Sequence, residues 1–567
     1  MSLNTTIDPQ TESPRDASPA ISHYPPLAGV NFIESWLRGH IKALALAITA
    51  AGLALRIAAA IRTYFNPDEI LHYLLIDQPS LLLAYKESLT NAHPPLIYVL
   101  LYYCHLLGRS ELVLRLPLIL AGTAFCWFTF EWIQMLFGGV AGLLALTVIA
   151  FSPIMIALSA EVREYALLLC CMAAALCFFE RALEKRSLPT MWCFSAFLYL
   201  AILSHYSAVF FALASGVYAL ARFADSRYPR RLIAAWAMGQ VGALAIYVFL
   251  YVTHVSKIKS HVALWAMPFG DTFFQPDQQS IFRFTRVNTW NIFLYTFAQR
   301  YVAEAMLIAF IAGAAFLFVR DFISAPGKQG AHHGPRHVSI QLLLPFIAVW
   351  MASIAGIYPY VGSRHTAFLA PFILAAASLA LAALCRQKLW AALLAAILLA
   401  GVSNYYGNPS EPGFTQANQS RKLMADAVGY LHQAASAGDF ILADQESSLP
   451  LAYYYCGAEA ANLLNWSGED FDQFHCQGHP IVTLNFWHLR AEGLTGSFEK
   501  MTRNYGLKPG ARVWVFQAGW KGYLLAHLPR EIAELRCVAP KTFGENITIV
   551  PLMVGPDLSP APQSSCN

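Results

Sequence analysis

The sequence predicts a polytopic α-helical membrane protein with a soluble α/β domain at its C-terminal end. Apolar residues make up 57% of the 567 residues and charged residues only 13%, whereas about 25% of the residues in soluble domains are charged. The mean hydropathy is +0.46, and apolar stretches close to the roughly 20 residues that cross a bilayer recur along the chain. These observations exclude an ordinary cytosolic, disordered or fibrous protein.

The chain begins with a polar segment, residues 1–42, which we expect to be a disordered cytoplasmic tail. It has neither the basic start nor the early apolar run of a cleaved signal peptide. A transmembrane domain is predicted over residues 43–403. Its eleven expected spans lie near residues 43–61, 113–136, 139–158, 165–181, 189–204, 206–221, 232–253, 301–319, 340–357, 366–384 and 389–403.

Lys and Arg in the short loops set the expected orientation, because such residues are enriched on the cytoplasmic side. With a cytoplasmic N-terminus, the basic loops near residues 185, 226, 328 and 387 all face inward. The N-terminus is therefore expected in the cytoplasm, and we expect a multi-pass protein of a bacterial-type inner (cell) membrane. The segments expected outside are the loops 62–112, 153–164 and 254–300 and everything after residue 404. Within the first loop, Pro94–Leu107 is too short to span and is predicted to lie along the interface.

The C-terminal segment, residues 404–567, is predicted to be an extracytoplasmic α/β domain. Its apolar strands alternate with amphipathic stretches. The strands are expected at residues 440–443, 481–484, 513–516 and 547–550, and the amphipathic stretches at residues 421–437 and 524–535.

Four cysteines lie in this segment, where disulfides can persist. They are Cys456, Cys476, Cys537 and Cys566, and we predict that Cys456 pairs with Cys476. No Cys-x-x-Cys motif is present, which disfavours a redox or zinc role for the cysteines. The net charge of +4, without a long basic stripe, makes nucleic acid an unexpected partner.

Three polar clusters are expected on the outer side of the membrane. Each also has an ordinary structural interpretation: a solvated loop or helix cap, a snorkelling ion pair, or an anchor to lipid headgroups. A guanidinium group could instead bind one phosphodiester. The clusters are Asp68 and Glu69 with His93 further along the same loop, then Glu161, Arg163 and Tyr165, and finally Arg364 and His365.

The ordered motifs resemble those of the GT-C glycosyltransferases. The motifs are Asp-Glu after the first span, His-Pro-Pro-Leu-x-Tyr, Arg-Leu-Pro, Ser-Pro-x5-Ser-x-Glu-x-Arg-x-Tyr, and a late Arg-His. They are most similar to the protein O-mannosyltransferase, aminoarabinose transferase and rhizobial galacturonosyltransferase branch, over roughly residues 40–400. The resemblance implies a polyprenyl-phosphate donor that carries one monosaccharide, transfer with inversion, and a lipid, glycan or protein acceptor.

The resemblance also implies roles for single residues. Asp68 matches the catalytic carboxylate and Glu69 its partner, and Arg364 matches a cation that contacts the donor phosphate. Glu161 and Arg163 match the second active-site turn. His93, Tyr165 and His365 are expected to complete the substrate site. A carboxylate such as Asp68 suits a general base, and a phosphate leaving group needs cations rather than a proton.

No soluble cofactor and no metal ligand set is expected. Relatives of the aminoarabinose type carry Asp in the second turn where this chain has Glu161, which argues against a metal shared between the two turns. A divalent cation stays open as an alternative, because several side chains offer oxygen or nitrogen ligands. These are Asp68, Glu69, His72, His93 and Glu161.

Two other classes of function remain open. A transporter or flippase of lipid-linked saccharides would carry ionisable residues near the bilayer midplane. Only Arg56 and Glu131 lie well inside the expected spans, and no Walker motif is present. A non-catalytic membrane scaffold with an exported binding domain is the third interpretation.

Overall fold

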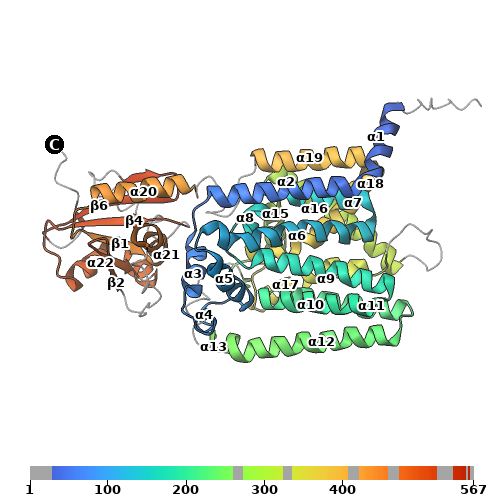
Figure 1. Cartoon of the computed structure of the whole chain (residues 1–567), viewed down its shortest axis with the longest axis horizontal. Helices are drawn as coiled ribbons and strands as arrows, with labels where there is room; N and C mark the ends of the chain where they lie inside the picture. Colours follow the sequence, from blue (N-terminus) through green and yellow to red (C-terminus); the bar gives the residue numbers. More distant parts are fainter. Residues whose placement is uncertain are drawn as a thin grey trace, which may run out of the picture.

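The computed structural model has two parts, a bundle of long helices and a sheet domain attached to one end of the bundle (Figure 1). The N-terminal helix α1 (Ala28–Gly39) lies at the opposite end. The structure describes residues 28–258, 273–323, 335–406, 420–457, 471–484, 486–519, 540–556 and 560–561.

Helices of different lengths form the bundle, and their packing buries one large hydrophobic core with two smaller clusters beside it. The helices are α2 (Ile41–Arg62), α6 (Glu111–Phe137), α7 (Gly139–Ala150), α8 (Pro153–Ser159), α9 (Tyr165–Lys185), α10 (Leu188–Ser204), α11 (Ala208–Asp225), α12 (Arg230–Leu250) with η1 (Tyr251–Val255) and α13 (Ser256–Ile258), α15 (Ile281–Phe297), α16 (Arg300–Phe318) with η4 (Val319–Ile323), α17 (Val338–Ile354), η5 (Arg364–Leu369) with α18 (Ala370–Leu384), and α19 (Leu389–Tyr406).

Among the described residues, seven helices are long and apolar enough to cross a membrane, or eight if the α7–α8 pair, bent by 66°, forms one span. The prediction of eleven spans exceeds this number. The other three predicted spans coincide with α10, α17 and α19, which are apolar but shorter. A helix of 17 residues is about 26 Å long, slightly less than the roughly 30 Å hydrocarbon core, which is why length alone does not establish these three as spans.

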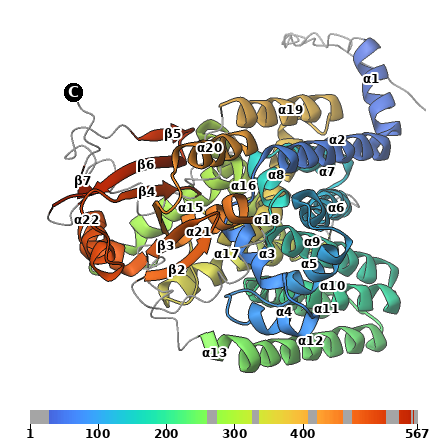
Figure 2. The same cartoon turned by 60° about the vertical axis from the view of Figure 1, so that its left-hand side comes forward.

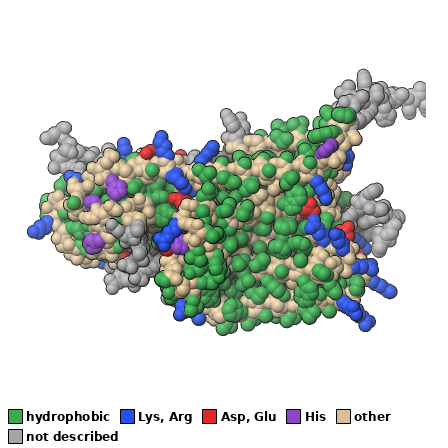
Figure 3. Space-filling view, viewed as in Figure 1, with side chains coloured by type: hydrophobic (Ala, Val, Ile, Leu, Met, Phe, Trp, Pro, Cys, Tyr) green, Lys and Arg blue, Asp and Glu red, His purple; other side chains and the backbone are tan. Residues whose placement is uncertain are grey.

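The surface of the bundle matches an integral, multi-pass membrane protein. Hydrophobic side chains cover the visible side of the bundle, and Lys and Arg gather toward its two ends (Figure 3). Exposed large apolar side chains occur along many helices, for example Leu120, Leu244 and Ile311. Exposed apolar surface on this scale is stable in lipid rather than in water.

The predicted disordered tail over residues 1–42 is wrong in its last part, because residues 28–39 form helix α1. Glu34 explains the attachment of this helix: its carboxylate accepts hydrogen bonds from the backbone N–H groups of Leu389 (2.8 Å) and Trp390 (3.3 Å) at the start of α19. Arg38 pairs with the same carboxylate at 2.6 Å. An acidic group at a helix N-terminus satisfies N–H groups that have no partner within the helix.

The predicted outer loops contain helices of their own. Residues 62–112 form α3 (Pro67–Ile76), α4 (Leu81–Ser88) and α5 (Leu96–Leu107), and the last of these coincides with the predicted interfacial helix. Much of the predicted loop 254–300 is helix α15, which packs against α8 and η5. The three short helices α3–α5 lie at the end of the bundle that faces the sheet domain (Figure 1).

The sheet domain is α/β, as predicted. Its strands run in the order β2-β3-β1-β4-β6-β5, with β7 paired to β6, and β3, β1 and β4 are parallel. Figure 2 shows the sheet with α20 and α22 nearby. The elements are α20 (Arg421–Ala434), β1 (Phe440–Asp444), α21 (Gln445–Pro450), η6 (Leu451–Cys456), β2 (Phe471–Cys476), β3 (His479–Leu484), α22 (Phe486–Asn504), β4 (Arg512–Gln517), β5 (Lys541–Phe543), β6 (Ile547–Val554) and β7 (Pro560–Ala561).

Both faces of this sheet are covered, which explains why its strands are nearly continuous apolar runs. Ile441 and Ala443 pack toward Met424 of α20, whereas Leu442 packs toward Phe498 of α22. All four predicted strands and the predicted helix near residues 421–437 are confirmed. The second amphipathic stretch, 524–535, lies outside the described residues.

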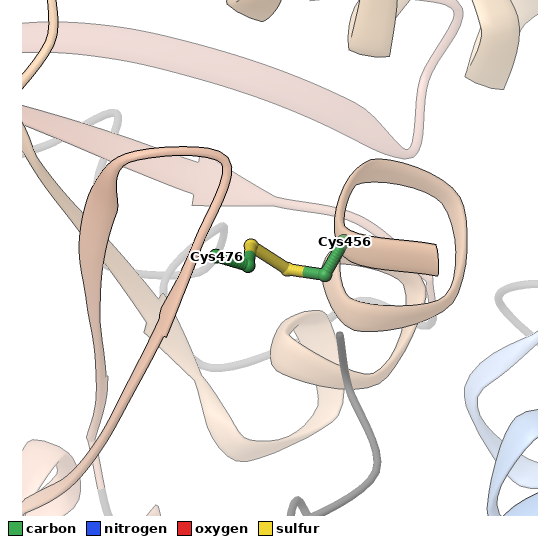
Figure 4. Close-up of a disulfide and its surroundings, with 2 residues drawn as sticks. All are labelled: Cys456 and Cys476. Atoms are coloured by element: carbon green, nitrogen blue, oxygen red, sulfur yellow. A yellow bond between two sulfur atoms is a disulfide. The ribbon is translucent and has the colours of Figure 1, made fainter. Parts of the chain in front are cut away.

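The predicted disulfide between Cys456 and Cys476 is confirmed, and it joins η6 to β2 (Figure 4). The two cysteines are 20 residues apart in sequence. Cys537 and Cys566 lie outside the described residues.

Candidate functional site

Helix α3 begins with a capping box. The two adjacent carboxylates in its first turn, Asp68 and Glu69, differ in their exposure. The N–H of Glu69 donates to Asn66 Oδ1 and the N–H of Asn66 donates to Glu69 Oε2, both at 3.0 Å. Pro67 occupies the first helical position, where its missing N–H is tolerated. The side chain of Asp68 is 25% exposed, whereas Glu69 is fully buried. Asp68 is therefore the carboxylate of this pair that a substrate can reach.

Glu69 is held by a network of hydrogen bonds. Arg115 Nε and Nη2 donate to its two carboxylate oxygens at 2.8 and 2.7 Å, and the N–H of Val162 donates to Oε1 at 2.8 Å. Arg115 also donates to backbone carbonyls at the end of the first span, including those of Ala60 (2.7 Å) and Tyr64 (3.0 Å). Glu69 thus connects α2, α3 and α6 to the turn before α9.

Asp68 lies between two arginines from distant parts of the chain. Its Oδ2 is 2.6 Å from Nη1 of Arg163 and 2.9 Å from Nη1 of Arg364. Burial raises the pKa of Asp68, but the charges of Arg163 and Arg364 outweigh this effect and hold the pKa well below its usual range. Asp68 is therefore an ionised carboxylate with two cations beside it.

Glu161 is buried in the same turn as Arg163. Burial and the negative charge of Glu69 raise the pKa of Glu161 to about 8, against the opposing charge of Arg364. Its Oε2 atom is buried without a hydrogen-bond partner. At neutral pH Glu161 therefore carries a proton and can donate a hydrogen bond.

Tyr165 and His365 lie against each other beside Arg163. Tyr165 Oη is 3.5 Å from His365 Nδ1, and the Arg163 guanidinium lies over the Tyr165 ring, 5.6 Å from its centroid. The hydroxyl of Tyr358 donates to the backbone carbonyl of His365 at 2.8 Å. These contacts fix the backbone around Arg364.

His93 contacts a carboxylate that the sequence analysis did not select. Its Nδ1 lies 3.1 Å from Oε1 of Glu164, and Nε2 of His72 lies 3.6 Å from Oε2 of the same carboxylate. Burial raises the pKa of Glu164, but the neighbouring His93 and Arg163 outweigh this effect and hold the pKa well below its usual range. This group of two imidazoles and one carboxylate lies directly beside Arg163, whose Nε is 3.9 Å from Glu164 Oε2.

The sheet domain reaches the same region through α21 and η6. Tyr454 Oη accepts a 2.6 Å hydrogen bond from the N–H of Phe65 and donates to Glu111 at 2.9 Å. Leu449 packs in one cluster with Phe65 and Ile70. Burial and the negative charges of Asp444 and Asp68 raise the pKa of Glu446 to about 8, so this acidic residue of the sheet domain lies close enough to Asp68 to be affected by its charge.

The structure brings all the predicted site residues into one region at the end of the bundle that faces the sheet domain. Two further polar residues of this region, Glu164 and Glu446, were not predicted from the sequence. His72 was predicted only as a possible ligand of a divalent cation, and Arg115 only as part of the Arg-Leu-Pro motif. Glu164 had a signal in the sequence, since it directly follows Arg163. Glu446 had no such signal in the sequence, because its position near Asp68 depends on how the sheet domain packs against the helical bundle.

The fold and this region together define a polytopic membrane protein with charged groups clustered where its helices meet an α/β domain. Residues 92–254 match the family model described as dolichyl-phosphate-mannose-protein mannosyltransferase. The predicted resemblance to the GT-C glycosyltransferases is thereby confirmed. The match supports transferase activity; it includes His93 and Arg163, whereas Asp68 and Arg364 lie outside the matched segment.

Several solved structures are similar in fold. ArnT from Cupriavidus metallidurans matches in its apo state with a TM-score of 0.47 and bound to undecaprenyl phosphate with a TM-score of 0.45, in both cases at 13% identity over 89% of this chain and 97% of that one. The apo oligosaccharyltransferase of Archaeoglobus fulgidus matches with a TM-score of 0.45 and 14% identity, over 76% of this chain and 64% of that one. No curated protein matches the chain in sequence.

Proposed function

We propose that the chain is an inverting membrane glycosyltransferase that moves one monosaccharide from a polyprenyl-phosphate donor to the hydroxyl of a lipid, glycan or protein acceptor. The observation that carries the proposal is the position of Asp68 between Arg163 and Arg364, 2.6 and 2.9 Å from their guanidinium nitrogens. The reaction takes place on the extracytoplasmic side of a bacterial-type inner membrane, with the N-terminus in the cytoplasm.

The two arginines suit a phosphodiester. Each guanidinium presents a planar set of N–H donors that matches phosphate oxygens. In the free protein the N–H groups of both guanidinium groups face the Asp68 carboxylate. When the polyprenyl-phosphate sugar binds, its phosphate replaces the carboxylate beside these N–H groups. Asp68 then loses part of the positive charge that lowers its pKa, so it becomes a stronger base when the donor is bound.

The chemical step follows from these positions. Asp68 removes the proton of the acceptor hydroxyl, and the hydroxyl oxygen forms a bond to the anomeric carbon of the sugar. The bond between that carbon and the phosphate oxygen breaks, and its electron pair stays on the phosphate. Arg163 and Arg364 stabilise the added charge on the leaving phosphate, and the sugar is transferred with inversion because a single displacement occurs.

The neighbouring acids have supporting roles. Glu69 is the positioning residue of the pair, because Arg115, Val162 and Asn66 occupy its oxygens. Glu161, with a pKa of about 8, is neutral at physiological pH and does not repel an incoming phosphate. His93, Tyr165 and His365 surround the same place and complete the proposed substrate site.

A lipid-linked donor also fits the depth of the site. A polyprenyl tail stays in the bilayer, so its phosphate reacts at the level of the headgroups. Asp68, Arg163 and Arg364 lie at the end of the apolar bundle, next to the sheet domain. A transporter would need ionisable groups deeper in the bilayer, and Arg56 donates to the carbonyls of Gly52 (3.0 Å) and Ala150 (3.2 Å), which is a structural role.

Purified protein in liposomes, given radiolabelled polyprenyl-phosphate sugars, tests the proposal by covalent transfer of label to an acceptor. We expect Asp68→Asn to lower turnover by about 10²–10⁴-fold, the usual contribution of a general base. Asp77→Asn is the matched control, because Asp77 caps the other end of α3, where it contacts Arg109 at 3.4 Å. Transport without transfer, or more than about a tenth of wild-type turnover in Asp68→Asn, would reject the proposal.

A further inference from the structure

We propose that His72, His93 and Glu164 bind a divalent zinc ion. One ligand atom from each residue, a ring nitrogen of His72, a ring nitrogen of His93 and a carboxylate oxygen of Glu164, lies within 4.8 Å of the other two. Two imidazoles and one carboxylate are a ligand set that zinc favours, and three protein ligands leave the fourth position open to an exchangeable oxygen ligand.

The distances suit a site that closes slightly on its ion. Zinc lies about 2.0–2.2 Å from nitrogen and carboxylate ligands, so tetrahedral ligand atoms are about 3.4 Å apart. The separations from Glu164 oxygens to His93 Nδ1 and His72 Nε2 are 3.1 and 3.6 Å. The two distances go to different oxygens of the carboxylate, so the side chains have to adjust for all three to bind one ion.

Unsatisfied polar atoms are the second observation that points to a ligand. Both carboxylate oxygens of Glu164 and Nδ1 of His93 are buried without a well-formed hydrogen bond. The Glu164 side chain is 0% exposed, and buried polar groups are stable only with partners. Nε of Arg163 does not supply one, since it lies 3.9 Å from Glu164 and has no hydrogen-bond partner itself.

The other nitrogen of His72 has the arrangement that metal-binding histidines usually show. Its Nδ1 lies 2.7 Å from the backbone carbonyl of Asp68, one helical turn earlier. That carbonyl is an acceptor, so Nδ1 carries a proton, and Nε2 is the ring nitrogen that would bind the ion. A backbone carbonyl behind the ligating imidazole fixes both its tautomer and its orientation.

From the sequence alone, a divalent cation could be bound by side chains among Asp68, Glu69, His72, His93 and Glu161. The proposed site keeps only the two histidines from that set and adds Glu164. Asp68 is paired with arginines and Glu69 with Arg115. The ion would therefore connect α3, the segment before α5 and the turn before α9, and it would lie next to Asp68 and Arg163 without being bound by them.

Metal analysis of the full-length protein tests the proposal independently of any transferase activity. The protein is purified in detergent with a tag that contains no histidine, stripped with EDTA, and titrated with Co²⁺ and then Zn²⁺. We expect about one equivalent of metal per chain, a Co²⁺ visible spectrum of tetrahedral nitrogen and oxygen ligation without thiolate bands, its displacement by Zn²⁺, and a higher melting temperature with metal.

Glu164→Gln and His72→Ala should each lower the affinity for Co²⁺ by at least tenfold. Loss of a group that only hydrogen-bonds to a metal ligand lowers metal affinity by about 10–100-fold, and loss of the ligand itself should have at least this effect. His105→Ala is the matched control, since His105 also lies beside a carboxylate, Asp77 at 3.4 Å, and should keep wild-type affinity. Absence of bound metal in the stripped and titrated wild type, or equal binding in all variants, would overturn the zinc site. The wild-type titration decides the question even if a variant fails to fold, and either outcome leaves the proposed transferase reaction unaffected.

Discussion

At the residue scale, the position of Asp68 determines what the site can bind. Its carboxylate neutralises Arg163 and Arg364 in the free protein, so these cations remain stable in a poorly solvated place until an anionic substrate arrives. A buried cation without a partner would be costly. In the proposed reaction the carboxylate therefore occupies the place of the donor phosphate until the donor binds, in addition to its proposed role as a base.

Replacing Arg364 by Lys distinguishes binding of the donor phosphate by the guanidinium group from an effect of the positive charge alone. Lysine keeps the positive charge but loses the planar guanidinium, so we expect the KM for the donor to rise about tenfold to a hundredfold, as for a lost charge-assisted hydrogen bond of about 1.5–3 kcal/mol. The turnover number kcat should fall less. Steady-state kinetics with varied donor concentration measure both.

The control for this substitution is Arg286→Lys, an exposed arginine on α15, which should leave both constants unchanged. An anchoring role for Arg364 at the headgroups predicts little change on substitution by Lys, because lysine also reaches the interface. A wild-type KM in Arg364→Lys would therefore contradict binding of the donor phosphate by its guanidinium.

The sequence identified Asp68, Arg163 and Arg364 as site residues, but it could not separate Glu161 from Glu164. Both carboxylates lie in one short turn, yet the pKa of Glu161 is raised to about 8 by burial and Glu69, whereas the pKa of Glu164 is lowered by His93 and Arg163 in spite of burial. The difference depends on which charges face each group, and those charges come from distant parts of the chain.

At the scale of single elements, the short helices after the first span required the structure. The sequence correctly placed a helix near Pro94–Leu107, but Glu69 looked like a second catalytic carboxylate. Its actual partner, Arg115, lies 46 residues later inside α6. A sequence shows that a carboxylate follows a Pro and can cap a helix; it does not show which distant arginine the carboxylate will meet.

Arg115→Met should destabilise the protein by about 3–5 kcal/mol, because it leaves the buried Glu69 carboxylate without its cation. Both side chains are 0% exposed. Thermal unfolding of the detergent-solubilised protein measures the change. The double variant Arg115→Met/Glu69→Gln should lose less stability than the sum of the two single variants, since it removes the unpaired charge.

Arg300→Met is the comparison for this experiment. Arg300 pairs with Glu304 at 3.0 Å, but their side chains are 74% and 42% exposed, so its replacement should produce little measurable change. Equal effects of Arg115→Met and Arg300→Met would show that the network around Glu69 does not hold the site together.

The disulfide between β2 and η6 should stabilise the sheet domain. It joins two cysteines that are 20 positions apart in the sequence, and the chain-entropy relation gives about 3 kcal/mol for a loop of this size. Cys456→Ser should therefore lower the unfolding temperature, and a reducing agent should have the same effect on the wild type. Cys193→Ser, at an exposed free cysteine of α10, should have no such effect.

At the scale of the whole molecule, the two ends of the bundle should face different compartments. Helix α1 lies at one end and the sheet domain at the other (Figure 1), which requires an odd number of crossings between them. Seven long helices satisfy this condition, and so do eleven spans, if the bent α7–α8 pair and the three shorter apolar helices also cross. A count of eight does not.

Reporter fusions measure this topology directly. We expect a cytoplasmic signal from a fusion at about residue 330 of the 567-residue chain and an extracytoplasmic signal from a fusion at the C-terminus, because the basic loops remain inside. A cytoplasmic C-terminus would contradict both the orientation and the location of the proposed site.

The overall plan of helical bundle and α/β domain could be predicted from apolar stretches and strand patterns alone. The way in which the two parts meet could not be predicted, since it depends on contacts such as Tyr454 with Phe65 and Glu111. Such contacts join residues more than 300 positions apart, and a single sequence contains no periodic signal for them.

Tyr64, which lies between the end of α2 at Arg62 and the start of α3 at Pro67, is part of the hydrophobic core of the sheet domain. A residue that follows the first span therefore belongs to the core of the sheet domain, so the two parts of the structure are not separated at a single point in the sequence. A chimera that exchanges the C-terminal domain for that of a relative would remove the surface on which residues 63–76 rest. Domain exchange in this architecture, whether by recombination or by design, has to transfer that segment together with the domain.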